Sequence, residues 1–423
     1  MPFDILFTPI QIGQKTAVNR LVNQPMESND ADERGKPTEL TFDRYRRLAE
    51  GGAGMIIVES LTISSRSRAR KNQLEISARN AEGLARLVGE MRAINDQSLI
   101  IFQINHAGNV SNGSFSEAVS YYPTGNPEIR ILSDKDVDEI KESFVQAAVI
   151  ARQAGADGID FKHCHGYWCG QLLRPANTKS GRFGGSFENR TRFFRETAAE
   201  IKTAVNDDAF ILGVRLSMYE GIIGGFGSSG PEEVTEDLTE PLAFARLIED
   251  TGFHFINVSS GIPVFTGEMT RPTINYPLGV YRHFSWATAV KKTTSIPLIG
   301  SGYSFLRNGK NNLPGDDPAQ KNLLYWAAKN IENCQVDLVG VGRQSLADPH
   351  FVKKVIAADL DNINYCIACG GCSTLLKSQA RVGCAVYNPF YKEELQRVKK
   401  TAKKNGFTRR WKNPRVDRPK RGL

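Results

Sequence analysis

Eight short runs of hydrophobic, often β-branched residues are the feature that most constrains the fold of this 423-residue chain. Each run has the length of a strand, and most are followed by a segment with helical periodicity. Alternating strands and helices favour parallel strands joined by right-handed crossovers, and eight such units close into a (β/α)8 TIM barrel. The sequence therefore predicts this α/β fold. The expected strands are residues 21–25, 55–60, 99–104, 158–162, 210–216, 254–258, 296–300 and 336–341.

Amphipathic segments between these runs predict the outer helices, at residues 41–51, 81–94, 134–154, 189–205 and 238–252. Residues 3–20 are expected to form a hairpin that closes the bottom of the barrel. Ligands of such barrels bind at the opposite face, over the C-terminal ends of the strands. We expect long loops at that face after the third, fifth and sixth strands, at residues 105–132, 219–235 and 261–281.

Strand alternation places several polar side chains inside the barrel near this face. Burying such groups is costly unless they contact a polar ligand or one another. A ligand site is thus one interpretation, and a salt-bridged barrel interior is the other. The side chains are those of Gln103, Asp160, Lys162 and Arg215.

Glycines end the seventh and eighth expected strands, in Gly300-Ser301-Gly302 and Gly340-Val341-Gly342, and Arg343 follows directly. Glycine lets backbone N–H groups approach an anion, and barrels often bind phosphate after strands seven and eight. Because both turns carry the signal, phosphate binding is favoured over tight turns alone.

The segment after the fourth strand is rich in groups that donate protons or hydrogen bonds. It contains Lys162, His165 and Tyr167, which suit general-acid or oxyanion-type work on a substrate. A zinc site made by His163, Cys164, His165 and Cys169 is the alternative, but the spacing is tight for zinc.

Four of the seven cysteines crowd near the C-terminus in the order C-x2-C-x2-C-x11-C. An odd total in a chain without a visible secretory signal argues against a disulfide framework. Three cysteines at successive spacings of three with a fourth further on favour a [4Fe–4S] cluster, and a four-cysteine zinc site is the alternative. The ligands would be Cys366, Cys369, Cys372 and Cys384.

The net charge of +8 arises in the last 27 residues, which hold twelve Lys or Arg and one acidic residue. The first 396 residues contain 42 basic and 45 acidic side chains, so the body is slightly acidic. A basic tail suits nucleic acid, an anionic membrane or an acidic protein as its partner, or simple solvation. We expect a cytoplasmic protein without a membrane span or a nucleic-acid partner.

Several motifs together resemble the Old Yellow Enzyme family, in its iron–sulfur branch with 2,4-dienoyl-CoA reductase and trimethylamine dehydrogenase. The resemblance runs from about Leu6 to Pro389. Its motifs are Leu6-Phe7-Thr8-Pro9, Asn19-Arg20, Gln24-Pro25-Met26, Gln103-Ile104-Asn105-His106-Ala107-Gly108, His165-Gly166-Tyr167, Gly184-Gly185-Ser186-Phe187-Glu188-Asn189-Arg190, Gly342-Arg343 and Ala347-Asp348-Pro349.

The resemblance implies non-covalently held FMN and two half-reactions, in which a donor reduces the flavin and the flavin then reduces an activated alkene. Tyr167 would supply the proton, while Lys162 and His165 would bind the substrate carbonyl. The family often has histidine at Lys162, and Cys or Thr at Glu27. The implied flavin contacts are Pro25 and Met26 along the ring, Gln103 at the pyrimidine edge, Arg215 near N1 and O2, and Gly302, Gly342 and Arg343 at the phosphate.

The expected organisation is an FMN barrel at residues 1–360, a [4Fe–4S] segment at 361–396 and a basic tail at 397–423. Relatives carry an FAD- and NAD(P)H-binding part after the cluster, and we expect none in this chain. Electrons are thus expected from NAD(P)H, from an acidic ferredoxin or flavodoxin, or from a separate FAD/NAD(P)H subunit. The leading hypothesis is a homo-oligomeric ene-reductase for unsaturated carbonyls or thioesters. An amine dehydrogenase or demethylase and an electron-transfer subunit are the alternatives.

Overall fold

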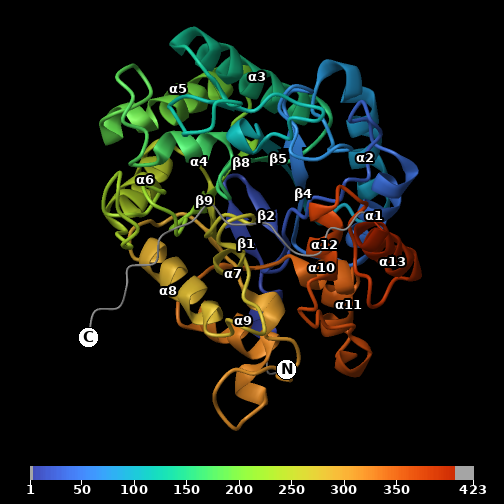
Figure 1. The fold of residues 1–423 in the computed structure, drawn as a ribbon. Helices are drawn as coiled ribbons and strands as arrows, with labels where there is room; N and C mark the ends of the chain where they lie inside the picture. The colour runs from blue at the N-terminus through green and yellow to red at the C-terminus, as the bar shows by residue number, and fades with distance from the viewer. Residues whose placement is uncertain (1–2, 405–423) are drawn as a thin grey trace.

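The computed structural model describes residues 3–404 and contains a closed barrel of eight parallel strands (Figure 1). Neighbouring strands follow the order β10-β11-β12-β3-β4-β5-β8-β9 around the barrel. The predicted TIM barrel is confirmed. Its strands are β3 (Leu21–Asn23), β4 (Met55–Thr62), β5 (Leu99–Asn105), β8 (Gly158–His163), β9 (Ile211–Ser217), β10 (Phe255–Ser259), β11 (Leu298–Gly300) and β12 (Leu338–Val341).

Helices surround the barrel and cover the outer faces of its strands (Figure 1). The five predicted helices form within a few residues of their expected bounds. They are α1 (Glu39–Glu50), α2 (Ala81–Ile94), α3 (Asp134–Gln153), α5 (Phe187–Val205) and α6 (Thr239–Asp250). The ring continues with α8 (Gly279–Lys291), α9 (Leu323–Glu332) and α11 (Phe351–Ile356), and short helices α4 (Trp168–Leu173), α7 (Gly267–Thr270) and α10 (Arg343–Ala347) lie in the loops.

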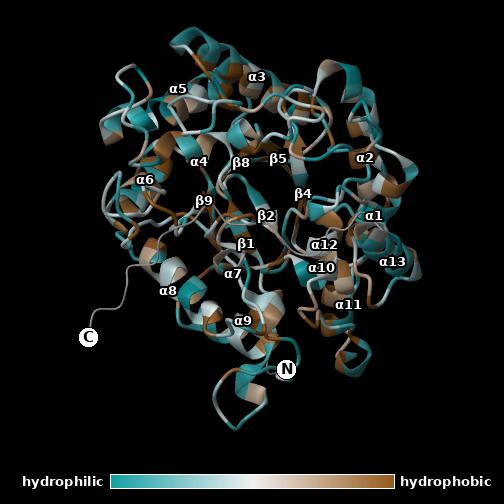
Figure 2. Cartoon of the chain, viewed as in Figure 1, coloured by the Kyte–Doolittle hydropathy of each residue, from teal (hydrophilic) through white to brown (hydrophobic). Residues whose placement is uncertain are grey.

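The hydrophobic core has two parts, one between the strands and the helices and one inside the lower barrel. Figure 2 shows the hydrophobic colour concentrated on the strands and on the inner sides of the helices. The predicted hairpin is present as β1 (Ile10–Ile12) and β2 (Lys15–Ala17), and its Ile12 and Ala17 pack into the lower barrel core. The bottom is therefore filled by apolar side chains, which leaves the other end for polar groups.

The chain after α11 forms a separate layer beside α1 and α10, which Figure 1 draws in red. It contains α12 (Gly371–Lys377) and α13 (Pro389–Lys404). Arg44 of α1 holds this layer, because it forms an ion pair with buried Asp30 and donates hydrogen bonds to the Val382 carbonyl and the Tyr391 hydroxyl. In the expected tail, residues 405–423 lie outside the described part of the chain. Among the described residues, no helix has the length and apolar character needed to cross a bilayer.

Candidate active site

One pocket at the C-terminal end of the barrel strands is lined by all ten residues predicted from the sequence to act in catalysis and flavin binding. The strand ends and the loops after β3, β8, β11 and β12 bring them there from across the chain. The ten are Pro25, Met26, Gln103, Lys162, His165, Tyr167, Arg215, Gly302, Gly342 and Arg343. Sequence order would not place these side chains together, but a closed barrel does.

A network of buried amides and one carboxyl group forms the floor of this pocket. Gln103 Nε2 donates a hydrogen bond to Asp160 Oδ2 at 2.8 Å. Gln24 and Asn257 exchange amide hydrogen bonds of 2.8 and 2.9 Å. Because a side-chain amide has two N–H donors and an acceptor oxygen, the second N–H and the oxygen of Gln103 remain for a ligand.

Arg215 lies beside this floor with an unsatisfied donor. Its buried Nε has no hydrogen-bond partner among the described residues. Burial raises the pKa of Asp160 to about 6, while the positive charge of Arg215 opposes the rise. A buried guanidinium nitrogen without a partner is costly, so the site is prepared for an acceptor on a bound ligand.

Two further guanidinium groups line the pocket, on Arg271 and Arg343. Neither group forms an ion pair within residues 3–404, and Arg343 donates only to the Pro272 carbonyl, at 2.9 Å. Burial, and then the nearby charge of Arg343, lower the pKa of Arg271. Two adjacent unpaired cations fit an anion, and Gly302, which lines the same pocket, has a left-handed φ of +97° that favours glycine.

These features fit FMN. Gln103 and Arg215 offer an acceptor and a donor to a polar ring edge, and Arg271 and Arg343 offer charge to a phosphate. One detail differs from the sequence interpretation. A Cβ atom at Gly342 would lie 2.9 Å from the Met26 sulfur, so this glycine also makes room for Met26.

In the part of the pocket lined by Arg70, Lys162 and Tyr167, three donors converge on the Glu27 carboxylate. Tyr167 donates its hydroxyl proton to Oε1 at 2.5 Å, Lys162 Nζ lies 3.2 Å from the same oxygen, and Arg70 Nε donates to Oε2 at 2.8 Å. Although burial pulls the other way, Lys162 and Arg70 hold the pKa of Glu27 far below its usual range. The carboxylate is therefore ionised at neutral pH.

Lys162 is almost fully buried and supports Tyr167 directly. Its Nζ donates to Ser60 Oγ at 2.8 Å and lies 3.5 Å from the centre of the Tyr167 ring. Burial lowers the pKa of Lys162 and Glu27 opposes this. Burial, and then Glu27, raise the pKa of Tyr167 well above 10. The phenol thus keeps its proton at neutral pH.

His165 turns into the pocket through a left-handed backbone conformation, with φ of +61°. Its Nε2 lies 2.7 Å from Ser259 Oγ. Burial, with further repulsion from Arg215, lowers the pKa of His165 well below 6.5, so its imidazole is neutral. His163 instead contacts the rings of Phe161 and Phe194, and in the described part of the chain the side chains of the alternative zinc site are not arranged to share one metal ion.

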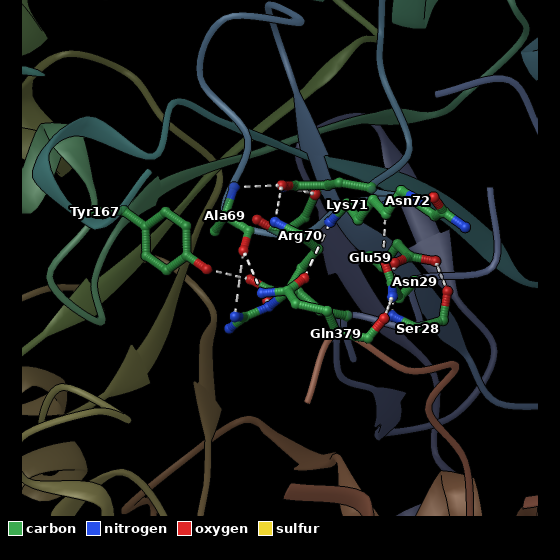
Figure 3. Close-up of polar contacts among 12 residues, drawn as sticks. Ser28, Asn29, Glu59, Ala69, Arg70, Lys71, Asn72, Tyr167 and Gln379 are labelled. Carbon is green, nitrogen blue, oxygen red and sulfur yellow. Dashed lines mark hydrogen bonds and ion pairs between the residues drawn. The ribbon is translucent and has the colours of Figure 1, made fainter. Parts of the chain in front are cut away.

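The loop after β4 supplies Arg70, and Gln379 fixes this loop from the cysteine-containing layer (Figure 3). The Lys71 N–H donates to Gln379 Oε1 at 3.0 Å, and Gln379 Nε2 donates to the Ala69 carbonyl at 3.2 Å. The amide therefore bonds the backbone on both sides of Arg70. Asn29 holds Gln379 in turn, because its Nδ2 donates a hydrogen bond to the backbone carbonyl of Gln379 at 2.7 Å.

The four cysteines nominated for the cluster line one small cavity beside the pocket. Arg343 and Cys372 line both spaces, so a single layer of side chains separates them. Within residues 3–404, no three His, Cys, Asp or Glu side chains are arranged to share one metal ion. Four cysteines that bind one zinc ion need their sulfurs about 3.8 Å apart. A cubane binds each cysteine to a different iron, so it accepts larger distances between the cysteine sulfurs.

Sequence reasoning missed several residues of the site. Arg70 and Arg271 lie in loops with no strand pattern, while Ser60 and Ser259 are common residues at strand ends. Glu27 was noticed only as a departure from the family pattern. A search for basic residues in the loop after the second barrel strand could have found Arg70.

The barrel and this pocket suit an enzyme that binds a polar, phosphate-bearing cofactor at the C-terminal ends of its strands. Residues 5–361 match the model of the NADH:flavin oxidoreductase / NADH oxidase family. The chain belongs to this family, whose name describes oxidoreductases that use a flavin.

Individual relatives cover most of this chain. The NADH oxidase of Thermoanaerobacter brockii is 30% identical over 380 residues, covering 88% of this chain and 54% of that protein. The N,N-dimethylglycine/sarcosine dehydrogenase of Chromohalobacter salexigens is 29% identical, covering 88% of this chain and 51% of that protein. A 2-naphthoyl-CoA reductase complex with 2-naphthoyl-CoA shares the fold at a TM-score of 0.78 and 22% identity, and the match covers 93% of this chain and 58% of that chain. This chain thus spans about half the length of these relatives.

Proposed function

We propose that this protein is an FMN-dependent ene-reductase that reduces an activated C=C bond of an α,β-unsaturated carbonyl compound or thioester. The convergence of Tyr167, Lys162 and His165 on the pocket that contains Gln103 and Arg215 carries this proposal. When bound, FMN supplies two-electron chemistry, by taking electrons from a donor and giving a hydride to the β-carbon.

The chain's own residues supply the proton and the carbonyl contacts. Tyr167 is protonated at neutral pH and suits protonation of the α-carbon as the hydride reaches the β-carbon, which balances the reduction. The charge of Lys162 beside the ring stabilises the phenolate left behind. His165 is neutral, so it suits a hydrogen bond to a substrate carbonyl.

An amine dehydrogenase or demethylase is the second candidate, supported by the relative that is named for N,N-dimethylglycine and sarcosine. The charges of this pocket disfavour a simple amine. Glu27 already has Lys162 and Arg70 as partners, so no free carboxylate is left there to attract an ammonium group. An electron-transfer subunit without catalysis would have no need of the Tyr167 arrangement.

We further propose that Cys366, Cys369, Cys372 and Cys384 hold a [4Fe–4S] cluster, which exchanges single electrons. Cys369 is exposed and Cys372 reaches the flavin pocket, so the cavity lies between solvent and flavin. NAD(P)H is the alternative donor. An acidic ferredoxin, a flavodoxin or a separate FAD/NAD(P)H subunit would approach the basic C-terminal region.

Anaerobic turnover tests the function. We expect loss of enone or enoyl-thioester absorbance with reoxidation of the reduced flavin, and no flavin reduction by methylated amines. The reverse result would favour the amine dehydrogenase.

Deletion of residues 405–423 tests whether a protein electron carrier is attracted by the basic C-terminal region, because it leaves α13 intact. The rate with a ferredoxin donor should fall and depend less on salt, and an unchanged rate would contradict electrostatic steering.

A further inference from the structure

The part of the pocket lined by Glu27, Arg70 and Lys162 carries more positive than negative charge. Arg70 and Lys162 both bind the single carboxylate of Glu27, which can compensate only one of them. The other bond of Lys162 goes to a neutral hydroxyl, on Ser60. The next carboxyl group, Asp160, is bonded to Gln103 on the floor and lies beside Arg215. One positive charge therefore remains at this wall of the pocket.

Arg70 is the group best placed to use this charge for binding. Its side chain is 17% exposed, lines the pocket and forms hydrogen bonds from Nε to Glu27 and from Nη1 to the Ala69 carbonyl. A guanidinium has five N–H donors in a planar fork, so donors remain for a ligand. The Tyr167 hydroxyl shares Glu27 with Arg70, so a group bound by Arg70 would lie next to the proton donor.

The position of Arg70 is fixed before any ligand binds. Gln379 bonds the backbone at Ala69 and at Lys71, on either side of Arg70 (Figure 3). Asn29 accepts from the Asn72 N–H at 2.7 Å and so holds the same loop again. A side chain on a fixed loop loses less entropy on binding than a mobile surface arginine. Such ordering is what a recognition site needs.

We propose that Arg70 binds a carboxylate group of the substrate. One excess charge matches a monoanion, and the planar fork of arginine matches two carboxylate oxygens. A phosphate dianion would reverse the charge imbalance instead of cancelling it. This inference deepens the proposed function, since it makes the substrate an unsaturated compound that also bears a carboxylate. Lys162 and His165 remain for the carbonyl that activates the double bond.

The test is a binding measurement on the oxidised, flavin-loaded protein without any reductant. Cinnamate and cinnamamide have nearly the same shape and differ in charge, and each is titrated while the flavin absorbance is followed. We expect cinnamate to bind at least about tenfold more tightly. Arg70→Met should weaken cinnamate binding by about 10- to 100-fold and cinnamamide binding little, since a charge-assisted bond is lost. Equal affinities for the two ligands, or an unchanged ratio in Arg70→Met, would overturn the proposal.

Two control variants sharpen the result. Arg66→Met removes the same charge from the same loop, but Arg66 is exposed and paired with Glu117, so the ratio should stay as in the wild type. Arg70→Lys keeps the charge without the fork and should retain part of the preference, which also guards against misfolding of Arg70→Met. Equal weakening of both ligands in Arg70→Met would indicate a structural role and contradict the proposal.

Phenyl phosphate is titrated as the competing anion, and tighter binding than cinnamate would overturn the assignment to carboxylate. Because no turnover is needed, the proposal is separable from the proposed function. If cinnamate binds through Arg70 while no unsaturated compound is reduced, the anion site stands and the ene-reductase assignment fails.

Discussion

The hydroxyl of Tyr167 donates a hydrogen bond to Glu27 Oε1, with 2.5 Å between the two oxygens. The carboxylate that receives it is ionised and also binds Lys162 and Arg70. The expected proton donor is thus protonated but held by a base that competes for its proton. Release of the Tyr167 proton to a substrate depends on how Lys162 and Arg70 share the Glu27 carboxylate. Substrate binding is thereby linked to proton transfer from Tyr167.

Replacement of the hydroxyl tests the acid role. We expect Tyr167→Phe to slow substrate reduction by roughly 10²- to 10⁴-fold, because proton transfer by a positioned acid contributes this much. Reduction of the flavin by its donor should be unaffected, and stopped-flow absorbance separates the two half-reactions. Tyr325→Phe is the control, because Tyr325 bonds Lys329 on α9, away from the pocket. Equal loss in both half-reactions would indicate a structural role.

Glu27→Gln removes the negative charge that raises the pKa of Tyr167. The pKa of the phenol should therefore fall, and the alkaline limb of the pH profile for substrate reduction should move to lower pH. A profile that stays in place would contradict the coupling between the two residues. Stopped-flow rates at a series of pH values measure the shift.

The same variant has a stability consequence. Because Lys162 and Arg70 depress the pKa of Glu27 in the folded protein, the carboxylate stabilises the fold above its unfolded pKa of about 4.5, and this is lost as pH falls. Breaking such a buried pair costs about 3–5 kcal/mol. The drop in thermal midpoint for Glu27→Gln should thus be full at pH 7 and shrink below pH 4.5. A drop independent of pH would contradict this.

The barrel and its inward polar residues could be predicted because they follow regular patterns. Two-residue alternation in β8 and β9 determines that Lys162 and Arg215 face the pocket, and the sequence carries that pattern in full. Arg70 and Arg271 could not be found in this way. Their positions depend on irregular loops, one fixed by Gln379 more than 300 residues away, and no local periodicity encodes such a contact.

The unpaired cations near Gly302 give a prediction for flavin retention. We expect Arg343→Ala to weaken FMN binding by about 10- to 100-fold, because a charge-assisted contact worth about 1.5–3 kcal/mol is lost. Arg271→Ala should have an effect of similar direction. Flavin fluorescence after dilution measures the dissociation. Exposed Arg246→Ala is the control. Full flavin retention by both pocket variants would exclude the phosphate assignment.

Gln379 is a positioning residue in our interpretation, because it touches the loop that carries Arg70. We expect Gln379→Ala to raise KM for an acidic substrate several-fold, with a smaller change in kcat. The Lys71 N–H, which Gln379 now accepts, should exchange faster with solvent. Gln379→Glu keeps that acceptor but loses the donor to Ala69, so it should restore slow exchange in part. Lys377→Ala, an exposed change on α12, should alter neither quantity.

The cysteine cavity yields a prediction for the second cofactor. Cys372→Ser should reduce iron and sulfide content and remove the electron paramagnetic resonance signal of the reduced cluster, because one of four thiolates is lost. Cys334→Ser is the matched control, since Cys334 is an exposed cysteine outside the cavity.

The same variant separates the two routes for electrons. Cys372 lines both the cavity and the flavin pocket, so its loss should interrupt transfer from a ferredoxin-type donor to the flavin. Reduction by NAD(P)H, if it occurs directly at the flavin, should survive in Cys372→Ser, and rapid mixing with each donor measures the two rates. Iron content equal to that of the control would exclude a cluster held by these cysteines. Loss of iron with an unchanged ferredoxin-donor rate would show that the cluster lies off the path of the electrons.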